Sequence, residues 1–268
     1  MSSELQRFLA FLEEQRSKQA PHFPTVKYAK VLSFMGTTSL PGTWASVSVN
    51  RVQRIAPAGT AREVRVDLAG PIARKPARGE CVTVHLTRVE QYQGYQVKTK
   101  PLQAQTPETD LVEEVAGSLA VKGQHVYTVH HSPYTLKFFE SVPFDELIET
   151  VGAVRYALVG VGETANISPR FVFHDEVRGG KVALYHGDGL ALKTYMNLKS
   201  NRNETRIVLD LDTFHGWTLR GVVEEFQPHQ QPEAYEKICG GFSSGNWGRP
   251  SRVFRFTAEE LAPIAPVG

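Results

Sequence analysis

The sequence has few cysteines and no long apolar run. Cys81 and Cys239 are its only cysteines and have no CxxC spacing, which excludes a disulfide scaffold and leaves a zinc knuckle without support. No apolar stretch approaches the roughly 18 to 20 residues that a membrane-spanning helix needs. We therefore expect neither a membrane anchor nor a signal peptide. So little cysteine is typical of a reducing compartment, and we expect the protein in the cytoplasm.

The sequence also lacks a surplus of charge of one sign. Its 268 residues include 30 Lys and Arg against 28 Asp and Glu, a formal net charge of +2. Proteins dedicated to nucleic acids or membrane surfaces carry a marked basic surplus, so we expect neither as a partner. Affinity for phosphate must then come from a few residues in one place. The 41% of hydrophobic residues are typical of a globular chain with one large domain or two.

Short strand-like segments dominate the chain. Period-two alternation predicts strands at 31–35, 44–55, 62–68, 81–89, 95–102, 125–130, 155–161, 166–174, 181–185, 205–211, 217–223 and 252–256. Helical spacing predicts an N-terminal helix capped by Ser3, a helix at 106–116, one beginning near residue 143, and helices at 190–199 and 232–239. Many short strands with few helices predict a mainly β fold with a small closed or partly closed antiparallel barrel in each half.

Two segments recur in the second half of the chain. Residues 27–29 resemble residues 155–157, each before a strand, and the aromatic-x-Gly-aromatic segment 92–98 resembles 214–220. This repetition favours a duplication, which predicts an N-terminal barrel at 1–120 and a C-terminal barrel at 121–268. The alternative is that any two antiparallel β-domains share hairpins with glycine at the turn.

The segment from Tyr185 to Lys199 carries the densest chemical signal. Gly187 and Gly189 allow a backbone to come close to a ligand, and the following helix offers free N–H groups and partial positive charge with Lys193 in its first turns. Together these features predict a phosphate site, to which the hydroxyl of Thr194 can add. The alternative is a tight turn followed by a solvated lysine.

Four motifs resemble the pyridoxamine 5'-phosphate oxidase-like FMN-binding split-barrel family. They are Arg155-Tyr-Ala-Leu-Val, Asn166-Ile-Ser-Pro-Arg, Gly187-Asp-Gly-Leu-Ala-Leu-Lys-Thr-Tyr-Met-Asn-Leu and Arg206-Ile-Val-Leu-Asp-Leu. The resemblance covers residues 144–226 and implies that Lys193 binds the FMN phosphate. It further implies that Ser168 and Arg170 line the flavin and that Trp247 and Arg249 lie near the cofactor. The cofactor-binding residues predicted in total are Ser168, Arg170, His186, Gly187, Gly189, Lys193, Thr194, Trp247 and Arg249.

The same resemblance implies an FMN-dependent oxidoreductase in which the flavin lies between two barrels. The two halves would form an intrachain pseudo-dimer, as a monomer or within a homodimer, with a small-molecule substrate and reduction by NAD(P)H or by that substrate. The first half departs from the family pattern because Pro71 and Pro76 interrupt the segment where the phosphate helix belongs. We therefore expect a single FMN site, formed mainly by the second half of the chain. The alternative is a non-catalytic protein that binds haem, flavin or deazaflavin.

Other polar segments have structural interpretations. His130 and His131 are neighbours in a predicted strand and point to opposite sides, so we expect no metal site there. Asp210 and Asp212 share a strand face with Arg206, which we interpret as the solvated face. The glycine-rich segment 240–245 follows a helix, and we interpret it as a flexible loop or lid. For the flavin ring, Phe171, Tyr185 and Trp247 are candidate flat walls.

Overall fold

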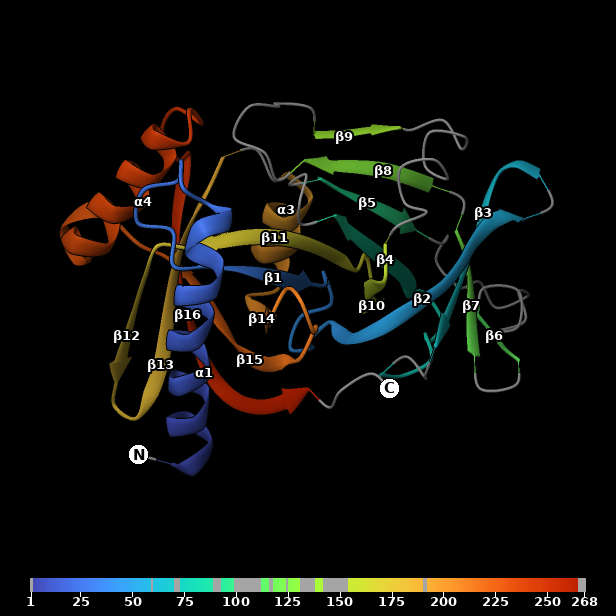
Figure 1. Cartoon of the computed structure of the whole chain (residues 1–268), viewed down its shortest axis with the longest axis horizontal. Coiled ribbons are helices and arrows are strands. Elements are labelled where there is room, and N and C mark those ends of the chain that lie inside the picture. The colour runs from blue at the N-terminus through green and yellow to red at the C-terminus, as the bar shows by residue number, and fades with distance from the viewer. Residues whose placement is uncertain are drawn as a thin grey trace. The chain divides into compact units, whose positions relative to one another are not determined.

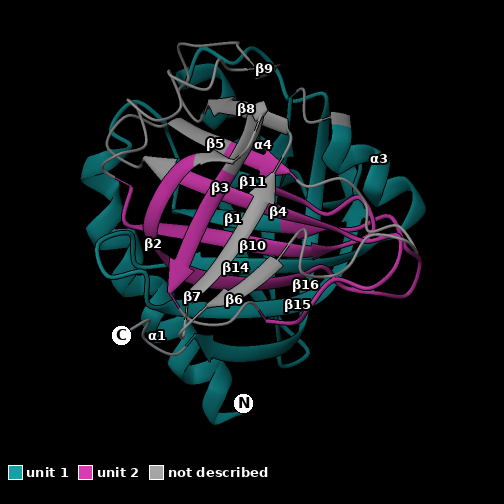
Figure 2. Cartoon of the chain, turned by 90° about the vertical axis from the view of Figure 1, so that its right-hand side faces the viewer, with its two compact units in different colours: residues 1–35, 168–266 teal, residues 36–167, 267–268 magenta. Residues whose placement is uncertain are grey.

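The computed structural model of the chain is mainly β (Figure 1). The structure describes residues 2–58, 60–69, 73–88, 93–98, 112–115, 118–123, 125–130, 138–141, 154–189 and 192–264. The chain divides into two compact units, unit 1 with Met1–Met35 and Ser168–Pro266, and unit 2 with Gly36–Ile167 and Val267–Gly268 (Figure 2). The predicted mainly β class is confirmed. Among the described residues, no helix has the length and apolar character that crossing a membrane requires.

Unit 1 is built on one seven-stranded sheet in the order β11-β1-β14-β15-β16-β13-β12. Its strands are β1 (Val31–Thr37), β11 (Asn166–Val172), β12 (His174–Arg178), β13 (Lys181–Asp188), β14 (Asn203–Leu209), β15 (Gly216–Glu225) and β16 (Arg252–Ile264). Its helices are α1 (Ser3–Gln19), α3 (Leu192–Ser200) and α4 (Pro232–Ser244), with 3-10 turns at Ala20–His22 and Pro228–Gln230.

The sheet of unit 1 curls so that its ends meet. β11 is the first strand in the order and β13 the sixth, yet the N–H of Phe173, just after β11, donates to the carbonyl of Tyr185 in β13 at 3.0 Å. Alternate residues of the strands therefore point into a small barrel. The apolar ones form a core with Leu5, Phe8 and Leu12 of α1. From the strands this core includes Val31, Met35, Val172, Val182, Leu184, Val208, Leu219, Val223, Phe254 and Phe256.

Unit 2 is built on a nine-stranded sheet in the order β6-β7-β3-β2-β10-β4-β5-β8-β9. These strands are β2 (Ser46–Ala58), β3 (Thr60–Ala69), β4 (Cys81–Arg88), β5 (Gln93–Lys98), β6 (Val112–Val115), β7 (Ser118–Gly123), β8 (His125–His130), β9 (Phe138–Ser141) and β10 (Tyr156–Gly162). One face carries the apolar core, which includes Val66, Leu68, Val82, Val84, Leu86, Val97, Ala157, Val159 and Val161.

On the opposite face of that sheet, β4 and β5 carry buried polar side chains. Thr83 Oγ1 donates to the carbonyl of Ala165 at 2.7 Å, and Lys98 Nζ donates to Asn166 Oδ1 at 2.7 Å. Gln96 Nε2 donates to the carbonyl of Ile167. These side chains all bind one short segment that follows β10, so they fix the course of the backbone there.

Two predictions about elements are wrong. Residues 112–115 form strand β6, whereas we predicted a helix over 106–116, of which 106–111 lie outside the described residues. Residues 240–244 belong to α4 and not to a flexible loop. A Cβ atom at Gly241 would overlap the ring of Phe173, and one at Gly240 would lie 2.7 Å from the ring of Tyr28. These glycines therefore allow close helix packing.

Several other predictions lie on or near undescribed residues. The helix predicted near residue 143 and His131 both lie outside the described residues, while His130 ends β8. The division predicted at residue 120 stays a prediction. Each compact unit combines two segments of the chain, Met1–Met35 with Ser168–Pro266 and Gly36–Ile167 with Val267–Gly268. The duplication of two barrels and their pairing as a pseudo-dimer stay predictions.

Candidate functional site

One end of the barrel in unit 1 carries charged side chains on the same strand faces as the apolar core. Arg206 and Glu204 of β14 are both 0% exposed. The Nε of Arg206 donates to Glu204 Oε1, and its Nη1 donates to Ser33 Oγ of β1 at 3.0 Å. The guanidinium also lies 5.2 Å from the ring centre of Phe256. Arg206 is thus held by three strands at the centre of the barrel end.

This burial corrects the interpretation of the β14 face. We expected Arg206 and Asp210 on a solvated face, but both are buried, and only Asp212 is exposed. Both faces of β14 are covered, because Glu204, Arg206 and Val208 on one face and Thr205, Ile207 and Leu209 on the other are all buried. Asp210 lies beyond the far end of the strand, where its Oδ2 accepts from Lys18 Nζ of α1 at 2.8 Å. Asp210 is therefore an anchor for α1 and takes no part in the charged cluster.

His186 of β13 adds a buried neutral imidazole to the cluster. Its ring stacks on Phe254, with centroids 5.4 Å apart and planes at 23°. Burial, followed by the positive charges of Arg206 and Arg170, holds the pKa of His186 well below its usual value. The neutral ring accepts through Nδ1 from Arg206 Nη2 at 3.3 Å. Its Nε2 has no hydrogen-bond partner among the described residues.

Two further arginines share one carboxylate. Arg170 Nη2 of β11 lies 3.5 Å from Asp188 Oδ1 at the end of β13, and Arg252 Nη1 of β16 lies 3.0 Å from Asp188 Oδ2. The guanidinium of Arg252 also lies 3.4 Å from the ring centre of Tyr195 in α3. Within the described part of the chain, Arg170 Nε and Nη2 have no acceptor in hydrogen-bond geometry. Burial lowers the pKa of Arg170, partly offset by Asp188.

The cluster has more positive than negative charge. Arg170, Arg206 and Arg252 face only Asp188 and Glu204 in the contacts above, and burial raises the pKa of Glu204 against the opposing effect of Arg206. Buried charge without a partner is unfavourable. An anion that accepts from Arg170 would lower the electrostatic cost of this surplus. The barrel end is therefore suited to bind an anionic group.

Helix α3 places further donors beside this cluster. Thr194 Oγ1 lies 3.0 Å from Ser168 Oγ, and both residues are buried. Ser168 and Arg170 are two residues apart on β11 and so share its inward face. Lys193 is the second residue of α3 and is half-buried. The structure thus brings Ser168, Arg170 and Thr194 together at one end of the barrel, with Lys193 adjacent to Thr194 in the chain.

The two predicted glycines contact α4. Gly187 alternates with His186 and Asp188 on β13, so it faces the opposite side of the strand. A Cβ atom at Gly187 would lie 2.5 Å from the ring of Phe242, and one at Gly189 would lie 3.7 Å from it. Close packing of α4 on β13 therefore accounts for glycine at position 187.

The predicted aromatic residues differ in how much surface they offer. Tyr185 is fully buried and Phe171 is nearly so, while Trp247 is half-buried. Trp247 stacks on Phe171 with ring centroids 5.5 Å apart and planes at 24°. Phe171 neighbours Arg170 in β11, so this stack belongs to the outward face. Arg249 follows on the exposed surface. Of the three candidate walls, only Trp247 keeps a substantial accessible surface.

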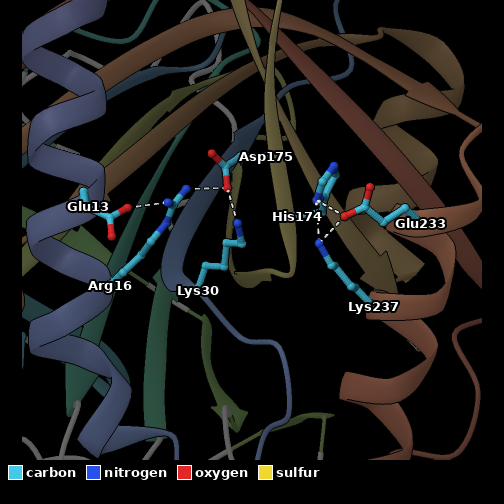
Figure 3. Close-up of polar contacts among 7 residues, drawn as sticks. All are labelled: Glu13, Arg16, Lys30, His174, Asp175, Glu233 and Lys237. Carbon is cyan, nitrogen blue, oxygen red and sulfur yellow. Dashed lines mark hydrogen bonds and ion pairs between the residues drawn. The ribbon is translucent and has the colours of Figure 1, made fainter.

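Strand β12 is held on both of its faces, which fixes the position of α4 (Figure 3). Asp175 pairs with Arg16 of α1 on one face. On the other face His174 Nδ1 accepts from Lys237 Nζ of α4 at 3.3 Å. Burial, then the charge of Lys237, lowers the pKa of His174, which keeps the ring neutral for this contact. These contacts hold the helix that leads to Trp247.

The sequence analysis missed five residues of the cluster: Ser33, Asp188, Glu204, Arg206 and Arg252. The available signal was the Glu204-x-Arg206 pair in a predicted strand between two others, where both faces can be covered. Among the described residues, no group of three or more His, Cys, Asp or Glu side chains could hold a metal ion.

No protein-family model matches the chain, and no curated protein matches its sequence. Among solved structures, an FMN-binding protein from Syntrophomonas wolfei subsp. wolfei is 16% identical, with a TM-score of 0.31, over 39% of this chain and 71% of that chain. A Clostridium acetobutylicum protein related to general stress protein 26 of B. subtilis (pyridoxinephosphate oxidase family) is 19% identical, with a TM-score of 0.30, over 37% and 69%. HupZ from Group A Streptococcus is 17% identical, with a TM-score of 0.30, over 39% and 78%.

Proposed function

We propose that this chain binds FMN and acts as an FMN-dependent oxidoreductase of the pyridoxamine 5'-phosphate oxidase-like class. The positive surplus beside α3, formed by Arg206, Arg170 and the partly exposed Arg252 against Asp188 and Glu204, is the observation that carries the proposal. Among the described residues, two nitrogens of Arg170 lack an acceptor, Ser168 and Thr194 add hydroxyls, and Lys193 adds an ammonium group. A phosphate monoester carries about two negative charges near neutral pH. Charge-assisted hydrogen bonds from such donors are the strongest that a protein can offer it.

The residues present fit the phosphate end of FMN better than its ring. Donors gather at one end of the barrel, whereas Trp247 is the only predicted wall with a substantial accessible face. Bound FMN would supply the electron carrier for hydride transfer with a small-molecule substrate and NAD(P)H or that substrate as reductant. The chain's own residues would bind and orient it through the phosphate, with Lys193 and Arg170 as the donors.

The proposal is tested by the absorption spectrum of the purified protein and by titration with FMN and riboflavin. We expect a yellow protein with flavin fluorescence, and FMN binding at least tenfold tighter than riboflavin, because riboflavin lacks the phosphate that the cluster recognises. Equal affinity for the two flavins would contradict a phosphate site. A Soret band without flavin would favour the haem-binding alternative, and a protein that takes up neither ligand would refute both. Reduction of bound FMN by NADH or NADPH then tests the oxidoreductase activity.

A further inference from the structure

We infer that Asp188 competes with the phosphate of the cofactor for Arg170 and Arg252, and thereby sets the affinity and charge preference of the site. This inference rests on the proposed function and concerns how tightly the same site binds an anionic ligand. Asp188 is only 4% exposed, and each of its carboxylate oxygens faces a different arginine, at 3.5 Å and 3.0 Å. A carboxylate and a phosphate are both recognised by guanidinium groups.

The contact between Asp188 and Arg170 is loose. A charge-assisted hydrogen bond between arginine and a carboxylate is normally about 2.7 to 2.9 Å long and often involves two parallel bonds. Here one nitrogen lies 3.5 Å from one oxygen, and Nη2 and Nε lack acceptors within hydrogen-bond geometry among the described residues. Arg170 is thus oriented by Asp188 and not saturated by it, so a phosphate oxygen can still accept from it.

The carboxylate opposes phosphate binding through its charge. Asp188 reduces the positive surplus that the two arginines create, and any phosphate that reaches Arg170 lies near a like charge in a poorly hydrated environment. Removal of that charge leaves more positive potential for a dianion. A neutral ligand such as riboflavin gains nothing from the change. The effect is therefore specific to the phosphate group.

The backbone at Asp188 is held independently of the side chain. Its carbonyl accepts from the N–H of Ser251 at 2.9 Å and from Ser251 Oγ at 2.9 Å. The strand end therefore keeps its position when the carboxylate is replaced by an amide of the same shape. Asp188→Asn is for this reason a clean test of charge.

The experiment measures FMN and riboflavin affinity of the full chain and its Asp188→Asn variant by fluorescence titration at fixed salt. We expect FMN to bind fivefold to fiftyfold more tightly to the variant and riboflavin to bind unchanged. Adding Arg170→Gln to the variant should remove most of the gain. Asp210→Asn is the matched control, because it removes the same charge from a buried carboxylate that pairs with Lys18 outside the cluster. It should leave FMN affinity within twofold.

Two outcomes separate this inference from the proposed function. If the original chain binds FMN but Asp188→Asn binds it equally well or more weakly, Asp188 is a positioning residue and the inference fails while the proposed function stands. If neither the original chain nor the variant binds FMN, both fail. If circular dichroism shows that Asp188→Asn does not fold, Asp188→Ser replaces it with the same expected gain.

Discussion

The two units bury polar side chains in different ways. In unit 2, Thr83 and Lys98 bind the segment that follows β10. Thr83 donates a hydrogen bond to a backbone carbonyl, and Lys98 donates one to the side chain of Asn166. In unit 1, the polar groups are mainly charged and face one another, as Arg206 faces Glu204 and Arg170 faces Asp188. The arrangement in unit 2 fixes the course of the backbone. The arrangement in unit 1 leaves two nitrogens of Arg170 without an acceptor among the described residues. This difference identifies the barrel end of unit 1 as the candidate site.

The expected contributions to stability also differ between the two arrangements. A hydrogen bond from a buried neutral side chain such as Thr83 to a carbonyl contributes about 0.5 to 1.5 kcal/mol to stability, and one from a charged group such as Lys98 contributes about 1.5 to 3 kcal/mol. A buried ion pair is weak evidence for stability, because desolvation of the charges offsets their attraction. A cluster of three arginines with two carboxylates therefore needs a reason other than stability. Recognition of an anion is the reason we propose.

Breaking the central pair of unit 1 has the largest expected effect. Arg206→Met leaves Glu204 buried without its cation and should lower the free energy of unfolding by about 3 to 5 kcal/mol in urea denaturation. The double variant Arg206→Met with Glu204→Leu removes both charges and should recover most of this loss. If the single variant costs less than about 1 kcal/mol, which is the scale of an exposed pair, Arg206 and Glu204 do not act as a buried ion pair.

Acid should destabilise both units through their buried histidines. Burial, followed by the charge of Lys98, lowers the pKa of His85 in unit 2 to about 3, and burial also lowers that of His186 in unit 1. The folded state then binds fewer protons than the unfolded state, so this stability is present above the unfolded pKa near 6.5 and is lost as the pH falls. His85 should cost about 1.4 kcal/mol per pH unit between that value and its folded pKa of about 3, and His186 should add a cost of the same sign.

The measurement compares urea unfolding at pH 6.5 and pH 4.5. Replacing His85 by Gln should remove about 2.3 kcal/mol from the loss between these two pH values, and replacing His186 by Gln should also make the loss smaller. His215→Gln is the control, since His215 is exposed on unit 1. Equal pH dependence in all three variants would show that the two buried rings do not control acid stability.

Lys193→Ala should weaken FMN binding by roughly 1.5 to 3 kcal/mol, the scale of a hydrogen bond to a charged group. Lys199→Ala is the matched control, because it removes the same charge from the exposed end of the same helix. Fluorescence titration with FMN measures both. If the two variants lose the same affinity, the loss reflects only the removal of one positive charge from α3. Lys193 then has no direct contact with the phosphate.

The smallest effect is expected for a neutral hydrogen bond in unit 2. Thr83→Val removes the hydroxyl that binds the carbonyl of Ala165 and should lower the free energy of unfolding by about 1 kcal/mol. The loss is limited because Lys98 Nζ also lies 3.4 Å from that carbonyl. FMN affinity should not change. A marked loss of FMN affinity would show that this polar face has a role in binding and would remove the contrast between the units.

Local patterns in the sequence identified most elements that frame the site. Alternation located the strands β11, β13 and β14, and helical spacing with the K-x-x-x-N-L motif located α3 with Lys193. The same rules failed at residues 112–115, where a helical apolar stripe lies in strand β6 because its pairing with β7 overrides local preference. They failed again at Gly240 and Gly241, where glycine permits packing of α4 and does not mark a loop.

The sequence by itself determined the mainly β class and the presence of cations and hydroxyls near α3, because period and residue type are local properties. Only the tertiary structure decided which of those side chains are buried together. Arg206 meets Ser33 across 173 residues of sequence, and no alternation within β14 shows that both of its faces are covered. Burial depends on neighbours that the fold supplies from far along the chain, so the charged face of β14 became part of the barrel interior.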